Sequence, residues 1–255
     1  MNQESATGKI GFEGKRARQI ICIDRRDACY LRIGSIRAAV RGGEDAKRTM
    51  IPLCSVADRI GAQFVQDECT GVDETAKTLK LKSGRSQPFD VLVWCTGSRS
   101  YCLADLPANC DYMKDMIAHL NAMSAVIGRA QNLLIIGGGP TGCELAGEIR
   151  AFYPDKKIAI ITASDKLLSS SIAPLSKKFV TTVQRKLESR EIKVMLNERV
   201  VDPSNKLQAG EGYMFNDGKP ITVRCASGTT IECDLILWAV PYDVNSAEVP
   251  SECPF

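Results

Sequence analysis

The sequence predicts an α/β protein made of two copies of one parallel-sheet unit, with the first copy incomplete. Short apolar strands alternate with amphipathic helices along the 255 residues, and this alternation is typical of parallel sheets. Stretches that alternate apolar and polar residues interrupt it and indicate antiparallel β-meanders. An internal repeat relates the two halves of the chain, and a glycine-rich turn appears in the second half only.

The first half begins with "QIICID" (19–24), an apolar run that predicts a buried strand. A short helical segment follows over 34–42. Residues 62–84 alternate apolar and polar side chains, which predicts a small antiparallel meander. "FDVLVWCTG" (89–97) predicts a second buried strand that stops at its glycine, and 110–127 has the periodicity of a helix.

The second half follows the same plan. Its glycine turn leads into a helix whose apolar positions, 142, 145, 146 and 149, lie on one face. A buried strand is predicted over 156–162, and apolar residues from Ile172 to Leu187 predict a second amphipathic helix. "IKVML" (192–196) alternates as a strand, and 221–240 predicts a hairpin followed by a final buried strand.

The internal repeat is visible without gaps when residues 83–97 are compared with 227–241. Four identities occur at a constant offset of 144 (238 − 94): Ser83 with Ser227, Gly84 with Gly228, Asp90 with Asp234, and Trp94 with Trp238. The strand 19–24 corresponds to 157–162 at an offset of 138. Subtracting 138 from 137–142 gives positions −1 to 4, where the chain reads "MNQES". We therefore expect the first copy to lack its first strand and phosphate loop.

The glycine turn has the chemistry of a dinucleotide site. It fits GxGxxG, follows the strand "LLII" and opens a helix, and in that context the motif is a strong signal. Glycines allow the tight turn and the close approach of backbone to a pyrophosphate, which the amides at the helix start would bind. The predicted loop residues are Gly137, Gly138, Gly139, Pro140, Thr141 and Gly142.

The second nucleotide contact is expected at the end of the next strand. An acid there normally binds the ribose hydroxyls of NAD, but this chain has Thr162, with Lys166 close by. The sequence therefore leaves NAD and NADP open. In the first copy the equivalent position is Asp24, which would bind an adenosine ribose; a simple strand-end cap is the alternative.

Composition excludes several other kinds of site. The net charge of +3 is too small for a dedicated nucleic-acid domain. The eleven cysteines contain no CxxC pair and have no regular spacing, which favours a reducing intracellular compartment, cytoplasm or mitochondrion, over a disulfide framework. Cys22, Cys95, Cys143 and Cys233 are expected to be small core residues. The single histidine, His119, is expected to be a half-buried helix residue, so no metal site is predicted.

Together these segments resemble a known superfamily, the FAD/NAD(P)-dependent pyridine nucleotide-disulfide oxidoreductases with two Rossmann-like units. "GGGPTGCELAGEIRAFYPDKKIAIITASDKLL" (137–168) and "IDRRDACYLRIGSIRAAV" (23–40) are most similar to the branch of apoptosis-inducing-factor-like and ferroptosis suppressor proteins, which is related to type II NADH dehydrogenases. The resemblance covers roughly 15–245. It implies FAD in the first unit, NAD(P)H in the second, and electron transfer through flavin to a quinone-like acceptor.

The resemblance also implies roles for particular residues. Asp24 would bind the FAD ribose, Arg37 the FAD phosphate or isoalloxazine, and the backbone near Cys69 the adenine. Thr96 and Gly97 fill an "ATG"-like turn, which here is "CTG". Glu144 would lie near the nicotinamide and the flavin as the catalytic residue. An exposed helix residue without a role is the alternative for Glu144.

We expect three segments: a partial FAD-binding domain (1–110), an NAD(P)-binding domain (111–241) and a polar tail (242–255), so that the chain is truncated at both ends. The unpaired sheet edge would be open to association with another chain. A weakly active or inactive NAD(P)-binding fragment or isoform, acting as an interaction module, is the alternative function. A DNA-binding role ranks last, and no transmembrane segment is expected.

Overall fold

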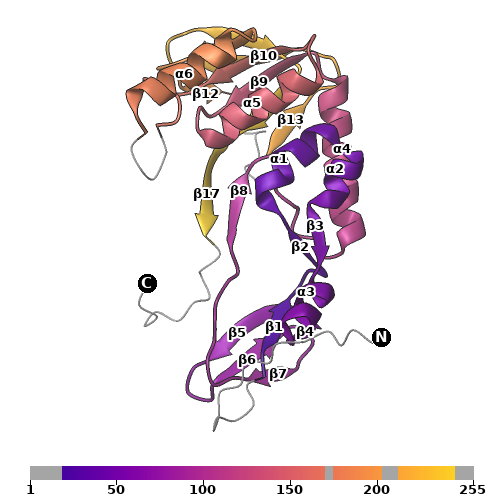
Figure 1. The fold of residues 1–255 in the computed structure, drawn as a ribbon. Coiled ribbons are helices and arrows are strands. Elements are labelled where there is room, and N and C mark those ends of the chain that lie inside the picture. Colours follow the sequence, from indigo (N-terminus) through magenta and orange to yellow (C-terminus); the bar gives the residue numbers. More distant parts are fainter. Residues whose placement is uncertain (1–18, 170–174, 203–211, 245–255) are drawn as a thin grey trace, which may run out of the picture.

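The computed structural model describes residues 19–169, 175–202 and 212–244. Its elements form two bodies (Figure 1). The small body consists of residues 19–25 and 53–97, and the large body contains the other described residues. Two connections join the bodies in Figure 1. One is the antiparallel pair β2 (Ala28–Tyr30) and β3 (Met50–Pro52), and the other leads into β8 (Ser98–Tyr101).

The centre of the large body is a five-stranded sheet in the order β11-β10-β9-β16-β13. The first four strands are parallel and β13 is antiparallel. This is the parallel α/β unit that the sequence predicts for the second half. The bounds are β9 Asn132–Ile136, β10 Lys157–Ile161, β11 Ile192–Met195, β13 Tyr213–Phe215 and β16 Leu235–Trp238.

Both faces of this sheet are covered by other elements. Successive side chains of a strand point to opposite faces, so each strand contributes to both layers of packing. In β9, Leu133 and Ile135 join the core cluster that also contains helix residues, whereas Leu134 joins a second cluster with Val223 and Cys233. The second cluster lies under the sheet β12-β14-β15, which includes the predicted hairpin. The covering elements are α4 (Met113–Arg129), α5 (Pro140–Phe152), α6 (Lys177–Glu188), β12 (Val200–Asp202), β14 (Ile221–Cys225) and β15 (Thr230–Cys233).

Two helices from the first half also belong to the large body. α1 (Arg32–Arg41) and α2 (Gly43–Arg48) follow β2 and pack on α4, and α1 also contacts α5. The small side chains Ala38 and Ala39 are fully buried there, which allows the helices to approach closely. The core is therefore continuous across residue 110, where the sequence suggests a domain boundary.

The small body has little core of its own. β1 (Ile21–Asp24) pairs in parallel with β4 (Gln63–Gln66), and α3 (Leu53–Ile60) precedes β4. The predicted meander is present as the antiparallel sheet β5-β6-β7, although β4 is not part of it. Only Ala57, Leu79 and Leu81 are buried among its described residues. The strands are β5 (Cys69–Asp73), β6 (Thr78–Leu81) and β7 (Ser86–Pro88).

The prediction of a buried strand over 89–97 is wrong. Residues 89–97 form no strand, Val91 and Val93 are 81% and 76% exposed, and Cys95 is exposed rather than a core residue. The equivalent residues of the second copy, in β16, are buried because β9 pairs with them. No described strand lies beside 89–97 in that way, and Val91 and Val93 remain exposed.

Two further boundaries differ from the prediction. α6 begins at Lys177, with Ser176 Oγ accepting from the Phe179 amide as its N-cap. Leu175 is therefore outside the helix and 41% exposed, and Ile172 lies outside the described residues. The start of the predicted tail is a strand: β17 (Val240–Val244) pairs antiparallel with β8. Residues 245–255 also lie outside the described part.

Candidate functional site

The glycine turn between β9 and α5 has a shape that side chains would disrupt. Gly137 has φ of +122°, and a Cβ there would lie 2.1 Å from the carbonyl oxygen of Ala239. A Cβ on Gly142 would lie 2.0 Å from the Gly137 carbonyl oxygen. A Cβ on Gly138 would lie 2.9 Å from Leu167 and 3.0 Å from Thr162. Glycine is thus required at Gly137 and Gly142 by backbone conformation or close packing against backbone, whereas Gly138 is packed tightly against side chains.

The helix that follows the turn offers an anion-binding end. Gly139 is its N-cap, Pro140 occupies the first turn, and no side chain caps the helix. The first amides of a helix have no intrahelical acceptor, and the helix dipole is positive at this end. A pyrophosphate is the natural acceptor for such amides. The described residues here therefore fit the phosphates of NAD(P)H, although the individual loop residues remain predicted contacts.

Thr162 lies at the end of β10, next to the glycine turn. Its amide donates to Met195 O over 3.0 Å and its carbonyl accepts from the Glu198 amide over 3.0 Å. Its hydroxyl accepts from the Ser164 amide over 3.4 Å. The methyl-bearing side of Thr162 faces Gly138. Thr162 thus lies where a ribose contact is expected, and its position still leaves NAD and NADP open.

The carboxylate of Glu198, between β11 and β12, does not replace the missing acid. Glu198 accepts from Ser227 Oγ over 2.7 and 2.9 Å, and from Thr229 Oγ1 over 3.3 Å. Its side chain is directed to the turn between β14 and β15. The only charged residues in the loop after Thr162 are Asp165 and Lys166, and both are exposed.

Glu144 and Arg37 come close together where α1 packs on α5. Arg37 Nε and Nη2 donate to Glu148 Oε1 over 3.0 and 2.7 Å, and Glu148 lies one turn after Glu144. Glu144 is exposed on α5, which is the alternative that the sequence left open for it; the desolvation that remains at this contact, and then the neighbouring Glu148 carboxylate, raise the pKa of Glu144, against the effect of Arg37. Arg37 therefore bridges the two halves of the chain in this structure, whereas the resemblance implies a flavin contact for it.

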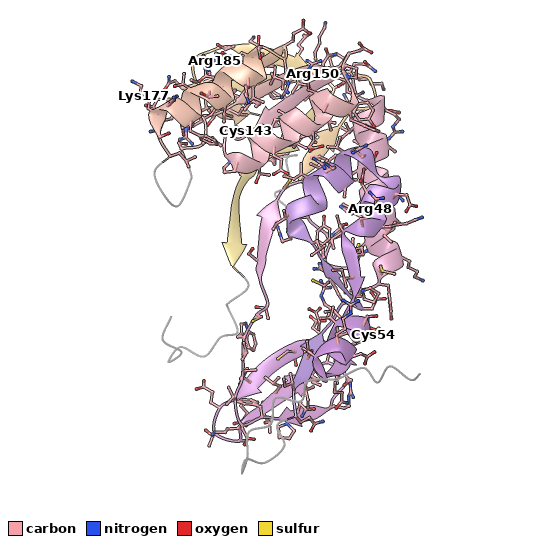
Figure 2. The ribbon with its side chains drawn as sticks, in the orientation of Figure 1. Arg48, Cys54, Cys143, Arg150, Lys177 and Arg185 are labelled. Atoms are coloured by element: carbon pink, nitrogen blue, oxygen red, sulfur yellow. The ribbon has the colours of Figure 1, made fainter. Side chains whose placement is uncertain are left out.

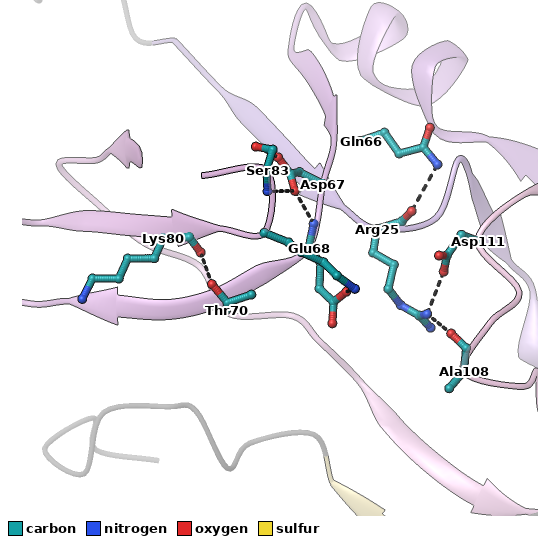
Figure 3. A network of polar contacts seen from close by, with 10 residues as sticks. Arg25, Gln66, Asp67, Glu68, Thr70, Lys80, Ser83, Ala108 and Asp111 are labelled. Carbon is teal, nitrogen blue, oxygen red and sulfur yellow. Dashed lines mark hydrogen bonds and ion pairs between the residues drawn. The ribbon is translucent and has the colours of Figure 1, made fainter. Parts of the chain in front are cut away.

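The first-unit residues gather at the carboxyl ends of β1 and β4. Asp24 Oδ1 accepts from the Arg26 amide over 2.8 Å, which is the strand-end cap that the sequence left as the alternative to a ribose contact. Gln66, at the end of β4, donates to the Arg25 carbonyl over 3.1 Å (Figure 3). Cys69 begins β5, and its thiol contacts the carbonyl of Gly71.

A polar network beside these strand ends fixes the chain there (Figure 3). Asp67 accepts from Ser83 Oγ over 2.5 Å and from Arg85 Nη2 over 3.0 Å. These hydrogen bonds, with those from the amides of Glu68 and Ser83, lower the pKa of Asp67 to about 2. Arg25 donates to Ala108 O and Asp111 Oδ1 and so ties the small body to the segment before α4.

The described residues do not form a complete FAD site. They provide Asp24 and the strand ends, while Thr96 and Gly97 lie in the exposed connection before β8, Gly97 with φ of +73°. Among the described residues only the second unit has a glycine turn between a strand and a helix. The described residues of the first unit therefore fit the adenosine end of FAD.

Cysteine, histidine and metal chemistry do not account for this site. The ten cysteines of the described part are unpaired; Cys54 is exposed on α3, whereas Cys143 is buried on α5 (Figure 2). Burial raises the pKa of Cys143 to about 11, so its thiol stays protonated at neutral pH. His119 is half-buried in α4, as expected, and burial lowers its pKa. No cluster of potential metal ligands occurs within the described ranges.

One residue that stabilises the fold was not identified from the sequence. Asp234 is 5% exposed, and its two carboxylate oxygens accept from the amides of Gln131 and Asn132, each over 2.9 Å. It thereby joins the start of β9 to the start of β16. The repeat already paired it with Asp90, and that identity was the available signal.

Comparison with known proteins agrees with this geometry. The family described as pyridine nucleotide-disulphide oxidoreductase matches residues 12–253. The chain belongs to this family. Its members are oxidoreductases that use FAD and NAD(P)H, so the predicted family, fold class and cofactor class are confirmed. No helix in the described ranges is long and apolar enough to cross a membrane.

Curated relatives include both proteins of the predicted branch. The chain is 29% identical over 240 residues to "Apoptosis-inducing factor homolog A" of Dictyostelium discoideum, covering 89% of this chain and 56% of the relative. It is 27% identical over 230 residues to "Ferroptosis suppressor protein 1" of Taeniopygia guttata, covering 89% and 57%. The chain thus spans little more than half the length of these relatives.

Solved structures show the same fold. A ferredoxin reductase from Rhodopseudomonas palustris superposes with a TM-score of 0.69 at 18% identity, covering 90% of this chain and 54% of that one. A water-forming NADH oxidase from Lactobacillus brevis, bound to NADH, gives a TM-score of 0.58 at 15% identity, covering 88% and 48%. At these identities the likeness establishes the fold alone.

Proposed function

We propose that this chain binds NAD(P)H at the turn between β9 and α5 and forms the nucleotide-binding part of an FAD-dependent NAD(P)H oxidoreductase. The observation that supports this best is the uncapped N-terminus of α5 behind a turn that tolerates only glycine at Gly137 and Gly142. NAD(P)H supplies a hydride when it is bound. The chain's own residues hold and orient it: loop amides bind the pyrophosphate, and Thr162 lies at the ribose.

Glu144 is the catalytic residue in this proposal, as the resemblance implies. It lies in the second turn of α5, beyond the amides that would bind phosphate, and a carboxyl with a raised pKa there would exchange a proton more readily near neutral pH. The acceptor that we propose is quinone-like. The likeness to proteins named ferroptosis suppressor and apoptosis-inducing factor homologues supports this choice.

The alternative is an NAD(P)-binding module without turnover. The absence of a second glycine turn from the described residues favours it. A pyrophosphate loop contributes several hydrogen bonds of about 1 kcal/mol each, so a unit without one would bind flavin more weakly by orders of magnitude.

One purified sample separates the two functions. The visible spectrum reports bound flavin, titration with NADH and NADPH reports nucleotide binding, and oxidation of NADH in the presence of a soluble quinone and added FAD reports turnover. Flavin absorbance with quinone-dependent NADH oxidation supports the oxidoreductase. A colourless chain that binds NADH and does not oxidise it supports the module. A chain that binds neither nucleotide contradicts both.

A further inference from the structure

Positive charge is concentrated on and around α6. Between residues 175 and 193 the sequence has six lysines and arginines against two glutamates, which gives this segment a net charge of +4. The whole chain has a net charge of +3, so all the other residues together are slightly acidic. The six cations of the segment are Lys177, Lys178, Arg185, Lys186, Arg190 and Lys193.

The helix directs its cations outward because its other face is buried. Val180 and Leu187 belong to the core, and α6 packs on β11 and α5. Lys178 and Arg185 lie two turns apart on the opposite, exposed side of the helix. Figure 2 shows Lys177 and Arg185 on α6, at the end of the large body that lies away from the small body.

These positive charges are not compensated by the protein itself. Within the described ranges, none of the six cations forms an ion pair, whereas basic residues elsewhere do, for example Arg37 with Glu148. The acid of the helix, Glu188, accepts from Gln184 Nε2 over 2.9 Å. Glu188 and Lys186 are two positions apart and so do not face each other. The outer face of α6 is therefore free to attract an anionic partner.

Two large apolar side chains lie at the N-terminal end of the same helix. Leu175, just before the N-cap, is 41% exposed, and Phe179, in the first turn, is 51% exposed. Lys177 and Lys178 lie between them in the sequence. Exposed Phe and Leu side chains next to several lysines and arginines are typical of helices that lie in the interface of a lipid bilayer.

An anionic bilayer fits this face better than other anionic partners do. The face is the convex outer side of a helix, whereas extended and helical peptides dock at strand edges or in grooves. Nucleic acid would be bound through its phosphates by the cations alone, and the aliphatic Leu175 would contribute nothing. A bilayer accommodates both kinds of side chain, the cations at its headgroups and the apolar groups at the acyl boundary.

We propose that the outer face of α6, together with Leu175, docks the chain on the surface of an anionic lipid bilayer. Lys178, Arg185 and Lys186 contact the headgroups, and Phe179 enters the acyl boundary. The binding is peripheral and reversible. It goes beyond the proposed function and does not depend on nucleotide binding at the glycine turn, so a failure of one leaves the other standing.

Sedimentation with vesicles tests the proposal on the full chain. Vesicles made of equal parts of phosphatidylcholine and phosphatidylserine should bind the chain saturably, and vesicles of phosphatidylcholine alone should not. NADH titration of the same samples measures the nucleotide site separately. A chain that binds neither kind of vesicle, or both equally, would overturn the proposal.

Matched variants locate the contact. Lys178→Ala with Lys186→Ala should weaken binding to the anionic vesicles by at least about tenfold, since each basic residue near an anionic surface contributes roughly a factor of five. Lys80→Ala with Lys219→Ala removes the same charge from two exposed lysines outside α6 and should leave the binding unchanged. Equal losses in the two double variants would contradict a specific face.

A third variant distinguishes a bilayer from other polyanions. Phe179→Ser keeps every charge and the N-cap of α6, and it should weaken binding to the anionic vesicles because the apolar contact is lost. NADH binding should be the same in all variants. If Phe179→Ser binds the vesicles as the parent chain does, while duplex DNA binds the chain and loses affinity in the Lys178 and Lys186 variant, the face is a nucleic-acid surface and the proposal is wrong.

Discussion

At the scale of single residues, Asp234 and Asp90 are the same residue of the repeat in two environments. Asp234 is buried and accepts two amide hydrogen bonds, and Asp90 is exposed. Hydrogen bonds to a buried carboxylate contribute about 1.5–3 kcal/mol each, and removing the acceptor leaves two buried donors unpaired. We predict that Asp234→Ala lowers the free energy of unfolding by about 3 kcal/mol in a urea titration. Asp90→Ala should change it by less than about 0.5 kcal/mol, and equal losses would contradict the assignment.

Glu144 allows a prediction about pH. Its pKa is raised in the folded state, so the protonated form is the one that folding favours. The favourable contribution is present below the unfolded pKa and is lost as the pH rises through the folded pKa. We predict that Glu144→Gln raises the Tm at pH 7 and leaves it unchanged at pH 3.5. Glu232→Gln, an exposed residue of β15, is the control and should show no such difference. A gain at both values of pH would rule out titration as the cause.

At the scale of elements, the sequence predicted the strands and helices whose packing partners are among the described residues. β9, α5, β10, β11 and β16 are present because their apolar periodicity matches neighbours that the chain itself supplies. The strand prediction for residues 89–97 failed because apolar periodicity indicates which side chains a strand would bury. It does not indicate whether a neighbouring strand exists. The pairing of β8 with β17 was not predicted, because β8 has no regular apolar face and most of β17 lies in the segment expected to be a polar tail.

In the candidate site, too, local features were predictable and contacts between residues far apart in the sequence were not. The shape of the glycine turn was predictable because GxGxxG specifies backbone conformations that only glycine adopts readily. The ion pair of Arg37 with Glu148 was not, because the two residues are 111 positions apart and meet only through the packing of α1 on α5. The Asp24 contact with the Arg26 amide is local, and the sequence had left it open.

The turn gives a prediction with an internal control. Gly137→Ala places a Cβ 2.1 Å from the Ala239 carbonyl and strains a backbone with φ of +122°. We expect a loss of roughly 1–3 kcal/mol of stability from backbone strain alone and no detectable NADH binding. Gly147→Ala, in the helix α5 that follows the turn and with open space around its Cβ, should raise stability by about 0.5–1 kcal/mol and leave NADH binding intact. Calorimetric titration with NADH, together with urea unfolding, measures both effects.

At the scale of the whole molecule, the two bodies are unequally held together. Both core clusters lie in the large body, and no described residue of the small body belongs to either. The large body also takes α1 and α2 from the first half, so the chain's packing divides at the β2–β3 pair and not at residue 110. The small body is held to the rest by polar contacts, such as Arg25 with Asp111, and by the packing of α3 on β2 and β3.

This imbalance predicts stepwise opening. A segment with few buried apolar contacts opens at a lower free energy than the global one, so the amides of β1 and β4 to β7 should exchange faster than those of β9, β10 and β16. Limited proteolysis should cut first in the exposed turn at 74–77 and leave a resistant large body. Saturating NADH at about 100 times its Kd should add about 2.7 kcal/mol to the stability of the large body alone. If instead all amides exchange together and NADH slows them equally, the two bodies form one cooperative unit, and the polar contacts between them contribute more than burial indicates.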